Sequence, residues 1–138
     1  MSDLPRVLFL CVHNAGRSQM ALGWFTHLAG GRAVASSGGS APGPEVNPAA
    51  VAAMAEVGID ISHESPKRWT DEIVGAADVV VTMGCGDACP LVPGTRYEDW
   101  LLADPFGKSL DEVRPVRDEI RRRVVELLES LDVPVPAT

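Results

Sequence analysis

The feature that most constrains the fold of this 138-residue chain is a near-continuous apolar run close to its start, from Arg6 to Val12. A run of this length and composition predicts a strand that is buried on both faces of a parallel sheet. Loop-like residues follow it, and Ser18 is a suitable N-cap for a helix that we expect to reach Ala29 and to end at Gly30. The chain is therefore expected to open with a strand, a short loop and a helix.

Strand and helix patterns alternate along the rest of the chain. This alternation predicts a single α/β domain over residues 1–138, with a four-stranded parallel sheet that carries helices on both faces. Ligands of such sheets bind at the carboxyl ends of the strands. We expect further strands at 33–37, 78–83 and 97–100. Further helices are expected at 48–57, with Asn47 as the cap before Pro48, at 70–75, and from a capping box of Ser109 and Glu112 to about Leu131. Loops are expected over 36–48 and 84–94, and a frayed tail over 133–138.

The composition limits the kinds of partner that the chain can bind. It is 46% hydrophobic with a net charge of −7, which fits a folded domain and leaves no electrostatic footprint for nucleic acid or an anionic membrane. We find neither a membrane-spanning segment nor a signal peptide, and so expect a cytoplasmic protein, and a monomer. The 3 cysteines are an odd number, and in a reducing compartment they are more often catalytic or metal-binding than structural.

A candidate anion site lies between the first strand and the first helix. A strand-to-helix turn directs backbone N–H groups into one concavity, with the positive end of the helix dipole behind them. That concavity would bind a tetrahedral oxyanion, Arg17 would hold two of its oxygens, and the same donors would stabilise Cys11 as a thiolate nucleophile. The Ser18 hydroxyl would donate to the sulfur, and the Asn14 side chain would hold the loop. The expected binding residues are Val12, His13, Asn14, Ala15, Gly16, Arg17 and Ser18.

Other interpretations of this loop remain open. A cysteine at a strand end is often a small buried hydrophobe, although Arg17 and Ser18 favour the catalytic interpretation of Cys11. His13 is expected to shape the loop or to lie on the surface rather than to act as a base.

Asp104 and Pro105 form a second candidate element just before the last helix. Attack by sulfur on an oxyanion must expel an oxygen, which leaves poorly without a proton, and a nearby carboxylic acid can supply that proton. Pro105 fixes the backbone after Asp104 and so limits where its side chain points. A turn is the default interpretation of such a dipeptide, but beside the Cys11 loop we interpret Asp104 as a general acid.

Cys85 and Cys89 form a third element in a loop that follows a predicted buried strand, so they are expected at the same sheet edge as Cys11. Two thiols this close can join if their Cα atoms come within about 7 Å. Thiol–disulfide exchange could then move oxidation from Cys11 to Cys85, on to Cys89 and finally to an external reductant. The alternatives are a zinc site, for which no nearby histidine pair supplies further ligands, and two inert cysteines.

Taken together, these residues resemble the low-molecular-weight protein tyrosine phosphatase fold and, within it, the arsenate reductases that are coupled to thioredoxin. The likeness extends over nearly the whole chain. It rests on Cys11-x5-Arg17-Ser18 and Asp104-Pro105-x-Gly107, and on the segments 17–21, 47–48, 58–62, 79–83 and 116–120.

The resemblance implies reduction of arsenate to arsenite. Cys11 would attack arsenate, Arg17 and the loop amides would hold the oxyanion, and Asp104 would protonate the departing oxygen. Cys85 would then attack Cys11 to release arsenite, and Cys89 would attack Cys85, which leaves a Cys85–Cys89 disulfide for thioredoxin to reduce. No bound cofactor is implied, because the electrons come from NADPH through thioredoxin reductase and thioredoxin.

The chain departs from this pattern in three places. Phosphatases of the fold usually carry a further cysteine where Gly16 stands, and well-known thioredoxin-coupled members space their resolving cysteines more widely than Cys85 and Cys89. Some relatives bind potassium through a glutamate where this chain has Leu22, so no metal site is expected. Three alternatives stay open: mycothiol with a mycoredoxin as the reductant, a low-molecular-weight protein tyrosine phosphatase, and a non-enzymatic thiol-based regulator that binds a metal or metalloid.

Overall fold

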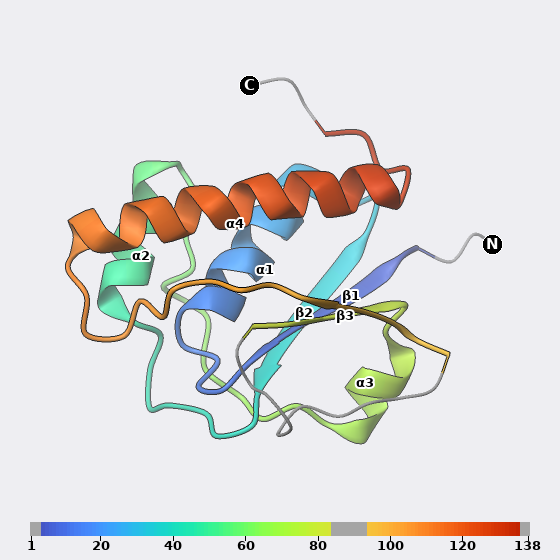
Figure 1. Cartoon of the computed structure of the whole chain (residues 1–138), viewed down its shortest axis with the longest axis horizontal. Helices are drawn as coiled ribbons and strands as arrows, with labels where there is room; N and C mark the ends of the chain where they lie inside the picture. Colours follow the sequence, from blue (N-terminus) through green and yellow to red (C-terminus); the bar gives the residue numbers. More distant parts are fainter. Residues whose placement is uncertain (1–3, 84–93, 136–138) are drawn as a thin grey trace.

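Strands and helices alternate in the structure as the sequence predicts. The computed structural model describes residues 4–83 and 94–135. Cys85 and Cys89 therefore lie outside the described residues. The elements are β1 (Arg6–Cys11), α1 (Arg17–Ala29), β2 (Val34–Gly39), α2 (Pro48–Glu56), α3 (Asp71–Ala76), β3 (Val79–Thr82), β4 (Arg96–Asp99) and α4 (Leu110–Ser130) (Figure 1).

The four strands form one parallel sheet in the order β2-β1-β3-β4. The chain first moves from β1 to β2 on one side and then crosses to β3 on the other. The strand order therefore reverses between β1 and β3, and the crevice at the carboxyl ends of these strands is where parallel α/β sheets bind ligands. Cys11, the last residue of β1, lies at this point.

Helices cover both faces of the sheet, which confirms the predicted layers. Helices α1, α2 and α4 lie over one face and α3 over the other (Figure 1). Along β1, Val7 and Phe9 belong to the core under α1 and α4, whereas Leu8 and Leu10 belong to the smaller core under α3. Successive side chains of a strand point to opposite faces, so a strand buried on both sides needs an unbroken apolar run.

The Phe9 ring anchors the larger core. Its centroid lies 5.7 Å from the Phe25 ring of α1 and 5.8 Å from the Trp100 ring, which follows β4. Helix α4 contributes buried residues at helical spacing to the same core, namely Val113, Val116, Ile120, Val124, Leu127 and Leu128. The long C-terminal helix therefore holds α1 and α2 against the sheet that carries Cys11.

The predicted N-cap of the first helix is wrong. Helix α1 begins at Arg17 with Gly16 at the N-cap position, and no side chain caps it. Ser18 is fully buried inside the first turn, where its hydroxyl lies 2.9 Å from the Cys11 sulfur. The Ser18 hydroxyl, which the sequence predicts as the helix cap, therefore contacts the Cys11 sulfur instead.

Two other boundaries differ from the sequence prediction. Strand β2 continues to Gly39, because residues 38 and 39, expected as loop, pair in register with the end of β1. The tail is not frayed at its start, since Val133 is 5% exposed and packs in the core, and its N–H donates to the Leu128 carbonyl.

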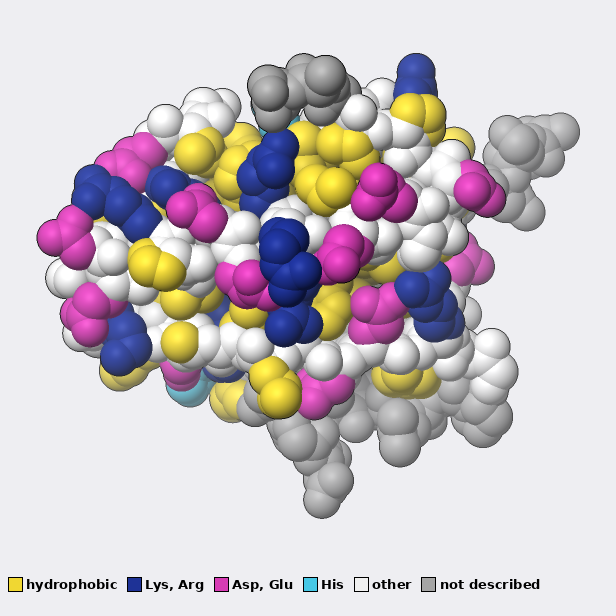
Figure 2. All heavy atoms as spheres, turned by 45° about the horizontal axis from the view of Figure 1, so that its top comes forward, with side chains coloured by type: hydrophobic (Ala, Val, Ile, Leu, Met, Phe, Trp, Pro, Cys, Tyr) yellow, Lys and Arg dark blue, Asp and Glu magenta, His cyan; other side chains and the backbone are white. Residues whose placement is uncertain are grey.

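No helix within residues 4–83 and 94–135 is long and apolar enough to cross a membrane. The face that α4 forms carries basic and acidic side chains next to one another rather than an apolar strip (Figure 2). Arg114 and Arg122 of this helix pair with Glu56 and Glu119, respectively.

Candidate active site

The loop between β1 and α1 is shaped by where its carbonyl groups point. The carbonyls of Val12, His13 and Ala15 accept hydrogen bonds from the N–H groups of Ala41, Gly43 and Asn47 at 2.8, 2.9 and 2.7 Å. In a trans peptide the N–H points opposite to the carbonyl. Tying these carbonyls outward therefore turns the N–H groups of the next residues, at positions 13, 14 and 16, toward the inside of the loop.

One of these inward N–H groups already has an acceptor. The Asn14 N–H donates to the Cys11 sulfur at 3.2 Å. Asn14 has a φ of 50°, a left-handed conformation that asparagine tolerates better than most residues. The loop thus closes over the sulfur, and the Cys11 side chain is 3% exposed.

A buried network surrounds the Cys11 sulfur. The Asn14 Oδ1 accepts from the Lys67 backbone N–H at 3.0 Å, so its Nδ2 faces the other way, where it donates to the Ser18 Oγ at 2.7 Å. The Ser18 Oγ lies 2.9 Å from the Cys11 sulfur, and either atom can donate in this contact, because a hydroxyl has one proton and two lone pairs. The sulfur thus has two hydrogen-bond partners, the Asn14 N–H and the Ser18 hydroxyl.

Gln19 also belongs to this network, through contacts with Asn14. It is fully buried, and its Nε2 donates to the Asn14 carbonyl at 3.1 Å and to the Asn14 Oδ1 at 3.2 Å. Gly39, opposite Cys11 in the sheet, has no room for a side chain, because an added Cβ would lie 2.5 Å from the Val12 carbonyl oxygen. The neighbouring strand therefore approaches the loop closely.

Positive charge reaches the loop from two sources. Arg17 opens α1 and is 11% exposed, and its guanidinium lies 3.6 Å from the Asp104 Oδ2 and donates to the Leu102 carbonyl at 3.4 Å. The first turn of α1 holds no acidic residue and has no side-chain cap, so its N–H groups and the positive end of its dipole stay available to an anion.

The Asp104 carboxylate faces the same hollow as the Cys11 loop. Its side chain is 51% exposed, and its Oδ1 accepts from the Phe106 N–H at 3.0 Å. The hollow is small, about 30 Å³, and its lining is Cys11, His13, Ala15, Gly16, Arg17, Asn47, Asp104, Pro105 and Phe106. A thiol side chain, a guanidinium and a carboxyl group thus meet at one small hollow.

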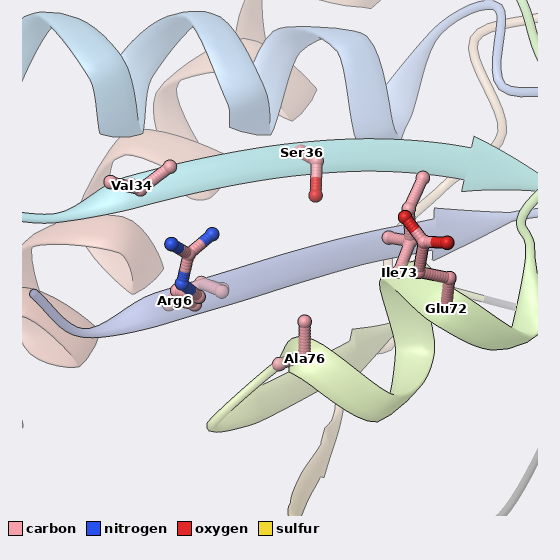
Figure 3. A pocket seen from close by; sticks show the side chains of 8 residues that line it. Arg6, Val34, Ser36, Glu72, Ile73 and Ala76 are labelled. Atoms are coloured by element: carbon pink, nitrogen blue, oxygen red, sulfur yellow. The ribbon is translucent and has the colours of Figure 1, made fainter. Parts of the chain in front are cut away.

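A second hollow, of about 180 Å³, contains none of these residues. It lies between α3 and the starts of β1 and β2, where the Arg6, Ser36 and Glu72 side chains border it (Figure 3). Arg6 opens β1 and Cys11 ends it, so five residues of strand, roughly 16 Å, separate the two places. The candidate chemistry belongs to the smaller hollow.

Known proteins are similar to this chain over most of its length. The family model of the low molecular weight phosphotyrosine protein phosphatases matches residues 6–136. The chain belongs to this family. Arsenate reductase 2 from Staphylococcus haemolyticus is 42% identical over 127 residues, which are 88% of this chain and 95% of that protein. A putative arsenate reductase from Halobacterium salinarum is 34% identical over 90% of this chain and 91% of its own length.

Solved structures give the same picture. A thioredoxin-dependent arsenate reductase from Corynebacterium glutamicum superposes with a TM-score of 0.81 and 41% identity, over 95% of this chain and 63% of that one. This chain thus spans less than two thirds of that relative. An arsenate reductase in its phosphate-binding state superposes with a TM-score of 0.81 and 36% identity, over 92% of this chain and 98% of that one.

Within the phosphatase family fold, the structure gathers most of the residues that the sequence singled out. Cys11, Arg17 and Asp104 line one hollow, and Asn14 and Ser18 hold the sulfur. His13 is exposed, with its ring centroid 6.2 Å from that of Phe106 at the rim.

Sequence reasoning missed two contributors to this site. Gln19 gave no signal, because a polar residue in the first turn of a helix is ordinarily exposed. Asn47 was recognised as a helix cap only, although it also lines the hollow and donates to the Pro105 carbonyl. Its position in the Asn-Pro motif was the one available sign.

Proposed function

We propose that this chain is an arsenate reductase that uses Cys11 as its nucleophile. The observation that carries the proposal is the Cys11 sulfur, held by the Asn14 N–H and the Ser18 hydroxyl at the wall of a hollow that Arg17 and Asp104 also line. The relatives named above as arsenate reductases cover most of the chain and supply the substrate class.

The first step is an exchange of ligands on arsenic. The Cys11 thiolate forms an S–As(V) bond, one oxygen leaves, and Asp104 supplies the proton that turns this oxygen into a better leaving group. Arg17 and the inward N–H groups of the loop hold the remaining oxygens. No redox step has occurred at this stage, because arsenic remains As(V).

Reduction follows when a second thiolate attacks the Cys11 sulfur. We assign this role to Cys85, so that an S–S bond forms while the S–As electron pair passes to arsenic, which leaves as arsenite. Cys89 then attacks Cys85, frees the Cys11 thiolate and leaves a Cys85–Cys89 disulfide. A two-electron reduction by a dithiol completes the cycle.

The described end of β3 supports this assignment. The Met83 N–H donates to the Leu10 carbonyl at 2.8 Å, so the chain leaves the sheet beside the end of β1 that carries Cys11. Two peptide units, roughly 7 Å of chain, separate Met83 from Cys85. A short path therefore joins the proposed resolving thiol to the nucleophile.

We propose thioredoxin as the reductant, supplied with electrons from NADPH by thioredoxin reductase. A dithiol protein suits a disulfide between two cysteines of one loop, and the reducing cytoplasm is where such a system operates. Neither a bound cofactor nor a metal is needed for these steps.

The direct test is a coupled assay. The protein with arsenate, thioredoxin, thioredoxin reductase and NADPH should consume NADPH and release arsenite in equal amounts. Cys11→Ser should lose this activity, whereas His27→Ala, on the exposed side of α1, should retain it. Failure with thioredoxin, mycothiol–mycoredoxin and glutaredoxin systems alike would exclude arsenate reduction.

The relay order is tested by trapping. After one round of arsenate, Cys89→Ser should hold a Cys11–Cys85 disulfide that mass mapping detects, because no third thiol remains to resolve it. Cys85→Ser should bind arsenate yet release arsenite poorly. Normal turnover of Cys85→Ser with thioredoxin would show that the order is wrong.

A second candidate function is hydrolysis of phosphate monoesters. It is favoured by the family match and by the fact that Cys11, Arg17 and Asp104 suffice for it without another thiol. Hydrolysis of an aryl phosphate that Cys85→Ser and Cys89→Ser leave unchanged, together with no arsenate turnover, would favour this function.

A further inference from the structure

Asn47 touches three segments that meet at the site. Its Oδ1 accepts from the Ala49 N–H at 2.9 Å and so caps α2. Its own N–H donates to the Ala15 carbonyl of the Cys11 loop at 2.7 Å. Its Nδ2 donates to the Pro105 carbonyl at 3.2 Å, on the loop that carries Asp104.

The cap does not require an amide. A helix N-cap uses only a side-chain oxygen, and serine, threonine or aspartate would serve α2 about as well as asparagine. The Asn47 nitrogen is therefore free to form the bond to Pro105. The same carbonyl accepts from the Lys108 N–H at 3.0 Å, which closes a turn. Asn47 therefore joins the Cys11 loop to the loop of residues 102–108 that carries Asp104, the acid loop.

Within residues 4–83 and 94–135, the other polar contacts that join the acid loop to the Cys11 loop and α1 come from Arg17. Its guanidinium reaches the Leu102 carbonyl and the Asp104 carboxylate, at 3.4 and 3.6 Å. An incoming oxyanion competes for the same guanidinium, and these ties weaken when it binds. The Asn47 bond to Pro105 joins two uncharged groups and uses one of the two Nδ2 protons, so an oxyanion in the hollow does not need to break it.

Packing holds Pro105 at the same place. Its Cγ lies 2.7 Å from where a Cβ of Gly16 would stand, so the proline ring rests directly on the Cys11 loop. Pro105 fixes the backbone next to Asp104. Anchoring its carbonyl therefore also limits where the Asp104 carboxyl group can lie.

We propose that Asn47 is a positioning residue that holds Asp104 over the Cys11 loop for proton transfer. The expected effect of Asn47 on the reaction rate rests on the proposed arsenate chemistry. Its expected effect on the order of the acid loop rests only on the hydrogen bond to Pro105. Asn47 acts through Asp104 and does not need to touch the substrate.

Asn47→Ser separates the two roles, because serine keeps the cap but is one atom too short to carry the amide bond to Pro105. Hydrogen exchange followed by mass spectrometry should show faster exchange over residues 102–108, with unchanged protection over α2. Thr70→Ala is the matched control: Thr70 caps α3 through a 3.1 Å bond from the Ile73 N–H, away from the hollow. It should leave 102–108 unchanged. No change in Asn47→Ser would overturn the holding role.

A double-mutant cycle then tests positioning. A positioned general acid raises the rate of the chemical step about 10²- to 10⁴-fold. An acid that is held less firmly should therefore lose a part of this rate enhancement. In single turnover with excess reduced enzyme, Asn47→Ser should lower the rate about tenfold and leave the competitive inhibition constant of sulfate unchanged. In the Asp104→Asn background the same change should have almost no effect, because the acid is already absent.

An equal loss in both backgrounds, or a loss of sulfate affinity alone, would overturn the positioning role. If the wild-type protein does not reduce arsenate, the proposed function fails, whereas the exchange result still decides whether Asn47 holds the acid loop. The two failures are therefore distinguishable.

Discussion

At the scale of single residues, the site depends on side chains that a local motif would assign to other tasks. The Ser18 hydroxyl lies against the Cys11 sulfur and also accepts from the Asn14 side chain. Asn14 in turn is held by a backbone N–H from residue 67, far along the chain. Each hydrogen-bond partner of the sulfur is thus placed by a neighbour.

Gly16 provides a prediction at this scale. Gly16→Ala places a Cβ 2.7 Å from the Pro105 Cγ, so the acid loop must move away from Cys11. We expect kcat/KM for arsenate to fall about tenfold, roughly 1.4 kcal/mol of transition-state stabilisation. The cost arises from the displaced Asp104 rather than from unfolding.

Gly43→Ala is the matched control, since it lies beside the same loop and its added Cβ would meet nothing closer than 3.8 Å. It should behave like the wild type in both the assay and thermal unfolding. Equal losses in the two variants would show that the contact with Pro105 is unimportant.

At the scale of elements, α4 holds the layer of helices onto the sheet. Its buried residues recur every three to four positions, and its start is fixed by the capping box of Ser109 and Glu112. Helix α1 is the opposite case, because its N-terminus has no side-chain cap. An anion in the hollow would supply the missing partner, so the bare helix end suits binding rather than stability.

Ile120→Ala tests how much α4 contributes. Ile120 is fully buried at the centre of the helix, and removing a buried isoleucine side chain to the Cβ costs about 2–5 kcal/mol. Urea unfolding of Ile120→Ala should give a free energy of unfolding that is lower by an amount in this range. Glu129 is exposed in the last turn, so Glu129→Ala should lower the free energy of unfolding by less than about 0.5 kcal/mol. A loss below about 1 kcal/mol for Ile120→Ala would mean that α4 packs less closely than the structure shows.

At the scale of the whole molecule, a net charge of −7 repels the anion that the hollow is shaped to bind. The basic side chains on the α4 face do not offset this repulsion, because acidic neighbours pair with them (Figure 2). Glu56 of α2 accepts from both Arg114 and Arg117 of α4. At the hollow itself, the favourable charges for an anion are Arg17 and the N-terminal end of α1.

The Glu56 pairs predict how stability depends on pH. Hydrogen bonds from Arg114, and next from Arg117, lower the pKa of Glu56 from 4.5 to about 2. A carboxyl group with a lowered folded pKa contributes its full stability above about pH 4.5, and this contribution is lost as the pH falls toward about 2. Glu56→Gln should therefore unfold at lower urea than the wild type near neutral pH.

The difference between the two proteins should narrow from about pH 4.5 downward and vanish near pH 2. Urea midpoints measured across this range check the expectation. A constant difference would mean that the glutamine disturbs packing and that the ion pairs contribute little, as is common for pairs that are partly exposed.

The sequence by itself determined the layers and the position of Cys11 between a strand and a helix. Hydrophobic periodicity is a local signal, so the apolar run at β1, the spacing along α4 and the caps at Asn47 and Ser109 could be read directly. Parallel strands place their carboxyl ends together, and from this the sequence predicted that the chain leaves β1 and β3 at one edge, where the structure pairs Leu10 with Thr82.

Only the tertiary structure decided which atom each polar side chain meets. Ser18 was expected to cap α1, but it turns to Cys11 because the sulfur and Asn14 both reach it in the folded chain. The nitrogen of Asn47 and the amide of Gln19 find partners 58 and 46 residues away, respectively. Hydrogen bonds between segments that are far apart in the sequence depend on how the layers pack. A local sequence pattern therefore cannot predict which distant group a polar side chain will meet.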